Sequence, residues 1–365
     1  MSEKEQYSCG CSDTNTTVKH RSVPVIGRIA TDAGNIDVVS TKWSMCDHIG
    51  EIKVRLDIAR MNYAIAPGVY AFGRPDSQSP VLVSANYKLS FDVLRRELEG
   101  LDVWILVIDT KGVNVWCAAG KGTFGTQELV ERVKATQLDR IVSTRKLILP
   151  QLGAPGISAH TVKALCGFQV VYGPVQARDL KKFFDAGMKA DPAMRRVYFG
   201  VMDRLTVSWL ELAVALKAAV LGTVLLAVLI VLTSTIPALT VFKGEAWMLL
   251  ILFWASVLSG TVLNAVLLPY LPGRAFSLKG GLLGAFIAVV IIYISKPHLA
   301  LTTTVAYTLM SAGLSAFLAL NFTGASTYTS LSGVKKEIRY SIPAIIAMVS
   351  AGALLEIVHI VRRLI

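Results

Sequence analysis

The sequence predicts two parts: an α/β Rossmann/flavodoxin-like domain followed by an all-α membrane domain of five transmembrane helices. The chain has 365 residues, of which 53% are hydrophobic and only 17% charged, which is too apolar for an ordinary soluble protein. The charges are concentrated early: residues 1–208 hold 27 Lys and Arg and 21 Asp and Glu, whereas residues 209–365 hold 10 and 4. Short apolar runs alternate with helical patterns in the first part, as in parallel α/β sheets.

These observations divide the chain into four segments. We predict a flexible N-terminal segment, an α/β domain, a juxtamembrane connector and a five-helix transmembrane domain, over residues 1–45, 46–190, 191–208 and 209–365 respectively. The charge balance is similar in both halves and no basic stripe is interleaved with aromatic residues, so nucleic acid is not an expected partner.

Five apolar segments of about 20 residues, each long enough to cross a bilayer, make up the second part: residues 210–232, 246–268, 278–294, 299–320 and 342–360. With the N-terminus inside, more basic residues lie in cytoplasmic loops (Arg274, Lys279, Lys335, Lys336 and Arg339). The bias predicts a multi-pass protein of the cytoplasmic membrane, with its α/β domain in the cytoplasm and its C-terminus outside. Charged residues within the helices are few, chiefly Glu211, Lys217 and Glu356, which favours an anchor over a transporter.

The first residues, MSEKEQYSCGCSD, are polar and do not resemble a secretory signal. The five cysteines are an odd number, and we expect them to be reduced in the cytoplasm. We interpret Cys46 and Cys166 as structural. Cys9 and Cys11 are close enough to capture a soft metal such as Hg(II), although a polar tail without a function is the simpler explanation.

The α/β pattern predicts strands at 63–72, 81–85, 103–108, 146–149 and 168–172, and helices at 90–99, 127–138, 159–166 and 177–186. In such a sheet, ligands bind beyond the carboxyl ends of the strands. Three loops rich in Gly and Pro fall there, at 114–126, 151–156 and 173–174. We therefore expect one ligand to span them.

The first of these loops contains Gly120-Lys-Gly122-Thr-Phe-Gly125, which satisfies the G-x-G-x-x-G pattern of dinucleotide sites. The strand at 146–149 ends in Pro150 and Gln151 rather than in the acidic residue that such sites use for the ribose. The phosphate-binding P-loop also fails, because Val115 occupies the place of its first glycine. A nucleotide-binding membrane oxidoreductase, and a transporter with a cytoplasmic ligand-binding domain, stay as alternatives.

Cys117 lies in the same loop, within NVWCAAGK. Lys121 follows four residues later, on the same side of any helical turn, and an ammonium there favours a thiolate. One cysteine cannot build a structural zinc site. It can, however, serve as an axial ligand to a metal whose other positions are filled by a macrocycle.

The motif NVWCAAGK resembles the signature of the mercury-methylating corrinoid proteins, the HgcA family. GKGTFGT, LPQLGAPG (149–156), YGPVQARDL (172–180) and PVLVSANYKLSFDVLRREL (80–98) also resemble the corrinoid domain of the corrinoid iron–sulfur protein of the acetyl-CoA pathway. FTGASTYTSLSGVKKEIR (322–339) resembles a motif of the same pathway. The pathway protein has threonine in place of Cys117, carries its own cluster cysteines, and has a barrel domain where this chain has membrane helices.

The resemblance implies a corrinoid-dependent methyltransferase that passes a methyl group from methyl-Co(III) to Hg(II), forming methylmercury. Cys117 would be the catalytic residue, as the lower axial ligand of cobalt on a cap helix. The implied cofactor-binding residues are Asn114, Val115, Trp116, Cys117, Ala118, Ala119, Gly120, Lys121, Gly122, Thr123, Gln151, Gly153, Ala154, Gly173 and Pro174. Small residues at 118–120 would allow close approach to a flat macrocycle.

The same resemblance implies partners. Cobalt must be reduced again to Co(I), and this chain has no Cys-rich cluster motif. A ferredoxin-like partner with 4Fe-4S clusters, of the HgcB type, is therefore the expected electron donor. The expected methyl donor is methyltetrahydrofolate, acting through a methyltransferase.

Overall fold

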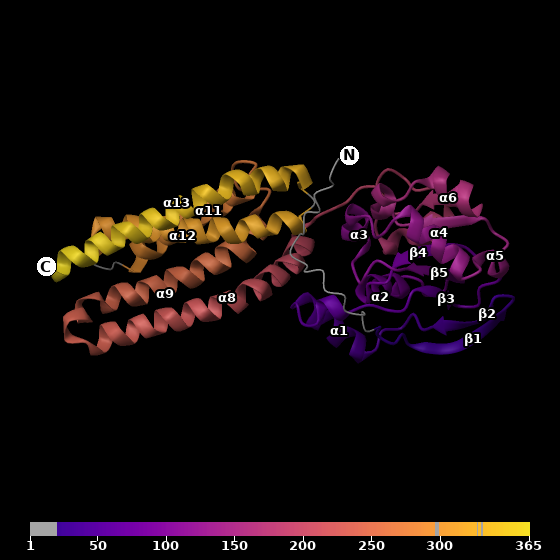
Figure 1. Ribbon diagram of the computed structural model, residues 1–365, viewed down its shortest axis with the longest axis horizontal. Helices are drawn as coiled ribbons and strands as arrows, with labels where there is room; N and C mark the ends of the chain where they lie inside the picture. The colour runs from indigo at the N-terminus through magenta and orange to yellow at the C-terminus, as the bar shows by residue number, and fades with distance from the viewer. Residues whose placement is uncertain (1–19, 296–298, 327, 330) are drawn as a thin grey trace, which may run out of the picture. The chain divides into compact units, whose positions relative to one another are not determined.

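The computed structural model describes residues 20–295, 299–326, 328, 329 and 331–365. The chain forms two compact units (Figure 1). Unit 1 comprises the described residues up to Val54 together with Ala59–Arg196, and unit 2 comprises Arg55–Ile58 together with Val197–Ile365.

Unit 1 is built on a seven-stranded sheet of order β1-β2-β3-β5-β4-β6-β7. Its strands are β1 (Val25–Thr31), β2 (Gly34–Val39), β3 (Gly68–Phe72), β4 (Val81–Ala85), β5 (Val103–Ile108), β6 (Lys146–Leu149) and β7 (Gln169–Tyr172). The run β5-β4-β6-β7 is parallel throughout. If these four strands are numbered in chain order, with β4 as strand 1 and β7 as strand 4, their order in the sheet is 2-1-3-4, as in flavodoxin-like sheets. The strand after β4 is added on one side of it and the next strand on the other side, so the direction of winding reverses between β4 and β6.

The parallel sheet that the sequence predicts is found in this run only, and the other half of the sheet is mixed. β1 is antiparallel to β2, and β3 is antiparallel to β5. The connections give the physical reason: a two-residue turn joins β1 to β2, and eight residues separate β3 from β4. Both are shorter than the dozen or more residues that a parallel crossover needs.

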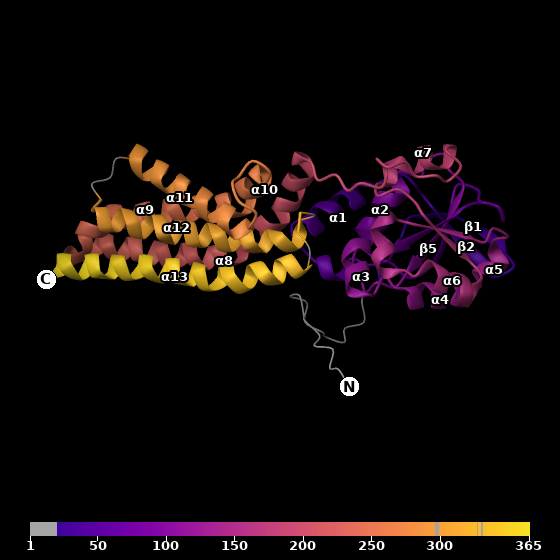
Figure 2. The ribbon, with the colours of Figure 1, turned by 90° about the horizontal axis from the view of Figure 1, so that it is seen from above.

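Helices cover both faces of the sheet, so that strands such as β5 are buried on both sides. Val103, Ile105 and Val107 belong to one hydrophobic core, and the alternate residues of β5 belong to the other. The first core contacts α2 (Lys88–Arg96) and α7 (Leu180–Asp185), and the second contacts α3 (Val115–Lys121), α4 (Thr126–Ala135), α5 (Leu138–Ile141) and α6 (Ala159–Cys166). Figure 2 shows α7 and the pair α4 and α6 on opposite sides of β5.

The N-terminal segment, expected to be flexible over residues 1–45, differs from that expectation in its described part. Residues 25–39 form the hairpin of β1 and β2, and Val38 of β2 pairs with Ala71 of β3. The α/β unit therefore begins before residue 46. Residues 1–19, including Cys9 and Cys11, lie outside the described residues. The remaining short elements of unit 1 are α1 (Met45–Arg55), η1 (Arg60–Asn62), η2 (Gln151–Gly156) and η3 (Ala177–Asp179).

Unit 2 contains five helices that are long and apolar enough to cross a membrane, at 201–235, 243–267, 276–295, 301–324 and 332–364 among the residues described. They confirm that the five predicted segments are long apolar helices, although several of their ends differ from the predicted ones. The first, α8 (Val201–Thr235), takes up part of the predicted connector 191–208. The others are α9 (Lys243–Leu258), continued by η5 (Ser259–Leu263) and α10 (Asn264–Leu267), then α11 (Phe276–Ser295), α12 (Leu301–Asn321) and α13 (Leu331–Leu364), with the turns η4 (Pro237–Phe242) and η6 (Phe322–Ala325).

Small residues allow α11 and α12 to pack at close range. A Cβ atom added to Gly284 of α11 would lie 2.5 Å from Cβ of Ser315 in α12, and one added to Gly280 of α11 would lie 2.7 Å from the Ser315 carbonyl oxygen. Close backbone approach through Gly and Ser is the usual way in which apolar helices associate within a membrane.

Candidate functional site

The candidate site lies where the parallel strands end, next to the point at which the sheet reverses its winding. The loop after β5 forms α3, and the loop after β6 forms η2, so these loops belong to the two strands that flank β4. The two segments meet: a Cβ atom on Gly156 of η2 would lie 3.2 Å from Cα of Ala119 in α3. Two of the three predicted loops are thus brought together at the ligand-binding edge of this fold.

A buried asparagine at the end of β4 fixes the chain that leads into α3. Oδ1 of Asn86 accepts hydrogen bonds from the Thr110 backbone nitrogen (3.0 Å), the Thr110 hydroxyl (2.8 Å) and the Gly112 backbone nitrogen (3.0 Å). Its Nδ2 donates to Asp109 Oδ1 at 3.0 Å. Asn86 is fully buried, so these bonds replace water. We did not predict this residue from the sequence, because its partners are more than 20 positions away.

Asp109 and Lys111 complete this turn. The Lys111 side chain and backbone nitrogen donate to the Asp109 carboxylate at 2.7 Å and 2.9 Å. Burial raises the pKa of Asp109, but the hydrogen bonds and charge of Lys111 outweigh burial, and the pKa lies below its ordinary value. Lys111 has a φ of 58° and Gly112 a φ of 70°. These two left-handed residues bend the chain sharply before α3.

Both ends of α3 carry recognised capping groups. At the start, the Asn114 side chain accepts a hydrogen bond from the Cys117 backbone nitrogen at 3.0 Å, as N-cap residues do. At the end, Gly122 adopts a left-handed conformation with φ 83°, and its nitrogen bonds to the Ala119 carbonyl. Cys117 is exposed in the first turn of this helix.

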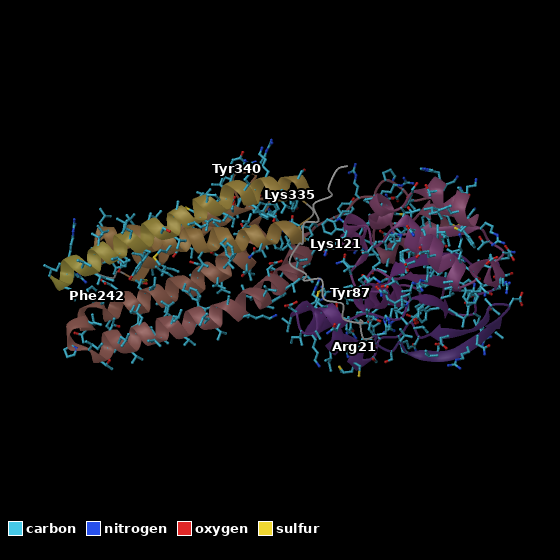
Figure 3. The ribbon with its side chains drawn as sticks, viewed as in Figure 1. Arg21, Tyr87, Lys121, Phe242, Lys335 and Tyr340 are labelled. Atoms are coloured by element: carbon cyan, nitrogen blue, oxygen red, sulfur yellow. The ribbon has the colours of Figure 1, made fainter. Side chains whose placement is uncertain are left out.

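The outer face of α3 carries Trp116, Cys117, Gly120 and Lys121, all of them exposed. Their spacing places them on one side of the helix. Trp116 is 39% exposed, and a Cβ atom added to Gly120 would meet nothing within 4 Å. Figure 3 labels Lys121 on this face. A thiol, an indole and an ammonium therefore border an open surface.

Ala118 and Ala119 face the other way, which corrects their expected role. They are 0% and 6% exposed and belong to the hydrophobic core. Their small size lets α3 sit close to the sheet; it does not open space above the helix. Of the small residues at 118–120, only Gly120 lies beside Cys117 on the open face. Val115 packs partly against the same core, and the Thr123 hydroxyl bonds back to the Ala118 carbonyl at 3.5 Å.

The turn η2 packs beneath α3 through Phe124. A Cβ atom on Gly153 would lie 2.5 Å from the Phe124 ring, and one on Gly156 would collide with the Phe124 carbonyl oxygen. Ala154 is half-buried in the same turn. Gln151, at the start of η2, has a buried Oε1 with no hydrogen-bond partner among the described residues.

The glycine motif has a different setting from that expected of a dinucleotide loop. A dinucleotide-binding motif follows directly after a strand and opens a helix, but six residues and then α3 separate β5 from Gly122. Gly122 ends α3, and Gly125 approaches the Gly122 carbonyl so closely that an added Cβ would lie 2.5 Å from it. These glycines make a tight turn between two helices, which removes the geometric basis of the dinucleotide alternative.

The other predicted residues are placed as follows. Gly173 and Pro174 are buried, and the Gly173 nitrogen bonds to the Leu149 carbonyl at 2.8 Å. Their contact with the ligand of the site stays a prediction.

The two remaining described cysteines lie outside α3. Cys166 is half-buried, and its thiol donates to the Val162 carbonyl at 3.2 Å. Cys46 is exposed at the start of α1, contrary to the expected structural role.

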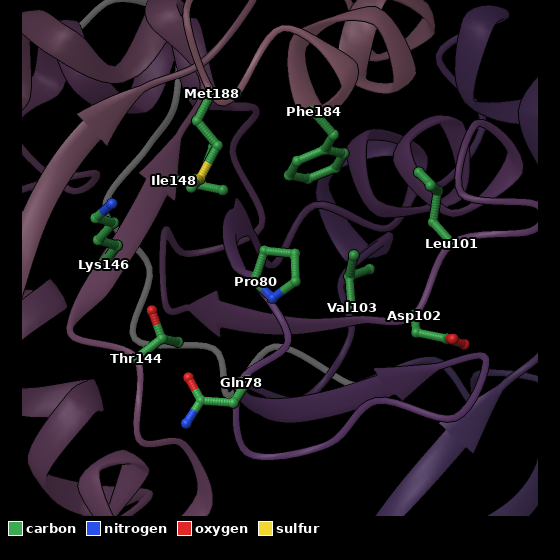
Figure 4. A pocket seen from close by; sticks show the side chains of 11 residues that line it. Gln78, Pro80, Leu101, Asp102, Val103, Thr144, Lys146, Ile148, Phe184 and Met188 are labelled. Carbon is green, nitrogen blue, oxygen red and sulfur yellow. The ribbon is translucent and has the colours of Figure 1, made fainter.

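Two further features of unit 1 lie apart from the outer face of α3. A pocket of about 380 Å³ at the opposite edge of the sheet is lined by Pro80, Val103, Lys146, Phe184 and Met188 together with six other residues (Figure 4). None of the predicted site residues lines it.

The second feature is a buried network of two acids and two bases. Arg95 bonds to Asp47 and Asp92 at 2.8 Å each, and Lys88 bonds to them at 3.1 Å and 2.6 Å. Burial raises the pKa of Asp47, but hydrogen bonds from Ser44, Lys88 and Arg95 bring it well below its ordinary value. This network ties α1 to α2 and has no open face of its own.

Among the residues described, no group of three or more His, Cys, Asp or Glu side chains could hold a metal ion. A metal at Cys117 would therefore need most of its ligands from another molecule. The donor set on α3, a single thiol beside an open and partly aromatic surface, suits a flat macrocycle that already fills the other positions.

The comparisons with known proteins concern this same region. Residues 58–184 match the family of the CO dehydrogenase/acetyl-CoA synthase delta subunit. The acetyl-CoA decarbonylase/synthase complex subunit gamma of Methanopyrus kandleri is 32% identical over 123 residues, which are 33% of this chain and 26% of that protein. The corrinoid/iron-sulfur protein large subunit of Moorella thermoacetica is 28% identical over 118 residues, 32% of this chain and 26% of its own length.

The chain thus spans about a quarter of the length of the curated relatives it matches. The match covers α3, η2 and the strands that carry them. Of unit 2 it includes only Ile58. Unit 1 is therefore similar to the corrinoid proteins of the CO dehydrogenase/acetyl-CoA synthase system.

Proposed function

We propose that this protein is a corrinoid-dependent methyltransferase of the mercury-methylating type, with Cys117 as the lower axial ligand of cobalt. The observation that carries the proposal is the exposed Cys117 thiol on a short helix, fixed at both ends, at the carboxyl edge of the sheet. The similarity of residues 58–184 to corrinoid proteins supports the cofactor class. The resemblance of NVWCAAGK to the mercury-methylation signature supports the substrate.

The residues of α3 fit a corrinoid in three respects. Gly120 leaves the face beside Cys117 open, Trp116 offers an apolar ring, and Lys121 offers a cation for an amide or carboxylate at the rim of the macrocycle. The buried, unpartnered Gln151 Oε1 is an acceptor for an amide of the same ligand. When bound, the corrinoid would carry the methyl group to be transferred.

The protein's own contribution would be electronic and positional. A thiolate is a soft, electron-rich donor, and an axial ligand of this kind tunes a metal in a macrocycle. Greater electron density would favour departure of the methyl group as a carbanion-like or radical species, which the electrophile Hg(II) can accept. The capped turns at Asn114 and Gly122 hold the sulfur in place, so that no reorganisation is needed on binding.

The partners and location belong to the same proposal. A ferredoxin-like 4Fe-4S protein would supply electrons, and a folate-linked methyltransferase would supply the methyl group. Unit 2 would hold the protein in the cytoplasmic membrane, with unit 1 in the cytoplasm and the C-terminus outside.

The test is a visible absorption spectrum of the full chain reconstituted with cobalamin, recorded for wild type, Cys117→Ala and Cys117→Thr. We expect the wild-type spectrum to differ from that of free cobalamin, and both variants to lose that difference together with at least a tenfold loss of methylmercury formation. Cys46→Ala, which removes an exposed thiol from α1 instead of α3, is the matched control. A Cys117→Ala protein with the wild-type spectrum would refute axial thiolate ligation. A normal cobalt spectrum without methylmercury would refute the substrate alone.

A further inference from the structure

A cluster of ionisable side chains lies inside unit 2, at the end where α9 and α12 begin and α13 finishes. Glu245 of α9 pairs with Arg363 of α13 at 2.8 Å, and His359 lies 3.7 Å from the same carboxylate oxygen. Glu356 of α13 lies 3.3 Å from the Tyr307 hydroxyl of α12. Ionisable groups inside apolar helices are costly, so they indicate a function or a tight pairing.

The charges of this cluster do not balance. With a neutral His359, Glu245 and Glu356 would contribute two negative charges, whereas Arg363 contributes one positive charge. Glu245 is only 6% exposed, and both carboxyls leave a buried Oε2 with no partner among the described residues. An uncompensated carboxylate in such surroundings is strongly disfavoured, so the cluster requires one more proton, carried either by a carboxyl or by His359.

Glu356 is the carboxyl that most needs this proton. Arg363 and His359 lie 2.8 Å and 3.7 Å from the Glu245 carboxylate, whereas Glu356 lies beside the neutral hydroxyls of Tyr307 and Thr303. His359 is also near enough to Glu356 to interact with its charge. Nδ1 of His359 lies 3.5 Å from the Thr302 hydroxyl, so the ring lies between Thr302 and Glu245. The other nearby cations, Lys243 and Arg362, are exposed.

The cluster is open on one side only. The Arg363 side chain is 38% exposed and stacks over Phe242, labelled in Figure 3, at 5.7 Å. In the other direction, buried polar residues continue along one face of α12 at intervals of four: Thr303, Tyr307, Ser311 and Ser315. Around Ser315 the helices touch closely, with Ser315 Oγ 2.8 Å from Ser259 Oγ and Gly284 directly against it. Close packing around Ser315 disfavours a continuous water chain at that level of the described helices.

We propose that Glu356, with Tyr307 and Glu245, forms a proton-binding site that exchanges with solvent at the end of unit 2 that contains Arg363. The ligand is a single proton: the carboxylate of Glu356 takes it from solvent and becomes a neutral acid. The site does not depend on the corrinoid chemistry proposed for unit 1, and the tight contact at Ser315 makes it a one-sided site and not a path across the membrane.

Infrared spectroscopy of the full chain in lipid nanodiscs tests this directly. At neutral pH, wild type should show the C=O stretch of one protonated carboxyl per chain, shifted in heavy water. Glu356→Gln should abolish this band. Glu337→Gln is the matched control, since this second glutamate of α13 accepts hydrogen bonds from Ser277, and it should keep the band. Tyr307→Phe should shift the band without removing it, because the hydroxyl contact is lost.

Two results would overturn the proposal: a wild-type spectrum without the band at neutral pH, or an unchanged band in Glu356→Gln. A second measurement covers the case of a poorly folded variant. Thermal unfolding of wild type should become easier as the pH rises and Glu356 is forced to ionise, and Tyr307→Phe should move this alkaline transition. An alkaline transition unaffected by Tyr307→Phe and by Glu356→Gln would also refute the site.

Discussion

Replacing Asn86 by alanine should loosen the turn that carries α3 while leaving the sheet intact. The side chain makes four hydrogen bonds, three accepted by Oδ1 and one donated by Nδ2. Thr110 and Gly112 are buried, so removal leaves their N–H groups without partners. A buried polar group without a partner costs about 1–3 kcal/mol. Two such groups give roughly 3 kcal/mol for the local opening of residues 109–117.

Hydrogen exchange measured on the full chain in detergent is the suitable assay, because it reports local opening separately from global unfolding. A decrease of about 3 kcal/mol in the free energy of local opening corresponds to roughly 100-fold faster exchange, since about 1.4 kcal/mol is a factor of ten in an equilibrium constant. The acceleration should be confined to the amides of Thr110, Gly112 and the first turn of α3. Amides of β6 and β7 should exchange as in wild type.

Two controls make the result decisive. Asn35→Ala removes an exposed asparagine from β2 and should change exchange near α3 by less than about 0.5 kcal/mol in opening energy. Asn86→Leu fills the volume but makes none of the hydrogen bonds, so it should resemble Asn86→Ala. If Asn86→Ala exchanged at the wild-type rate around α3, the claim that this residue positions Cys117 would be wrong.

Two further predictions concern single positions. Gly120→Ala should raise the stability of the ligand-free chain by roughly 0.5–1 kcal/mol, as Gly→Ala does inside a helix, because its added Cβ meets nothing; thermal unfolding checks this, and a loss of stability would contradict the open face. The same variant should bind cobalamin more weakly in a titration. For Asp47, the folded-state pKa lies below its ordinary value of 3.8, so its stabilisation is present above pH 3.8 and is lost as the pH falls below it. Asp47→Asn should therefore be less stable at neutral pH and should lack that part of the acid dependence; an unchanged acid profile would count against the buried network.

The elements with strong local patterns could be predicted from the sequence, and those defined by distant contacts could not. The run at 103–108 is a strand to the residue, because an unbroken apolar segment of this length is buried on both faces of a sheet. The run at 146–149 also matches to the residue, with three buried apolar residues after the exposed Lys146. The hairpin of β1 and β2 escaped prediction because it is mostly exposed at the sheet's edge and lacks such a run. Ala118 and Ala119 were expected to face a ligand, since their small size says nothing about which side of α3 they occupy.

The contacts that hold α3 in position do not involve the Cys117 side chain. The contacts that fix the helix are made by backbone groups and by Asn86, Asn114 and Gly122, while the Cys117 side chain points to the exposed face. A substitution at 117 therefore leaves the helix in place, since only the backbone nitrogen of this residue takes part in capping. Different side chains at position 117 can therefore be compared on an unchanged helix, which makes Cys117→Thr a test of the donor atom alone.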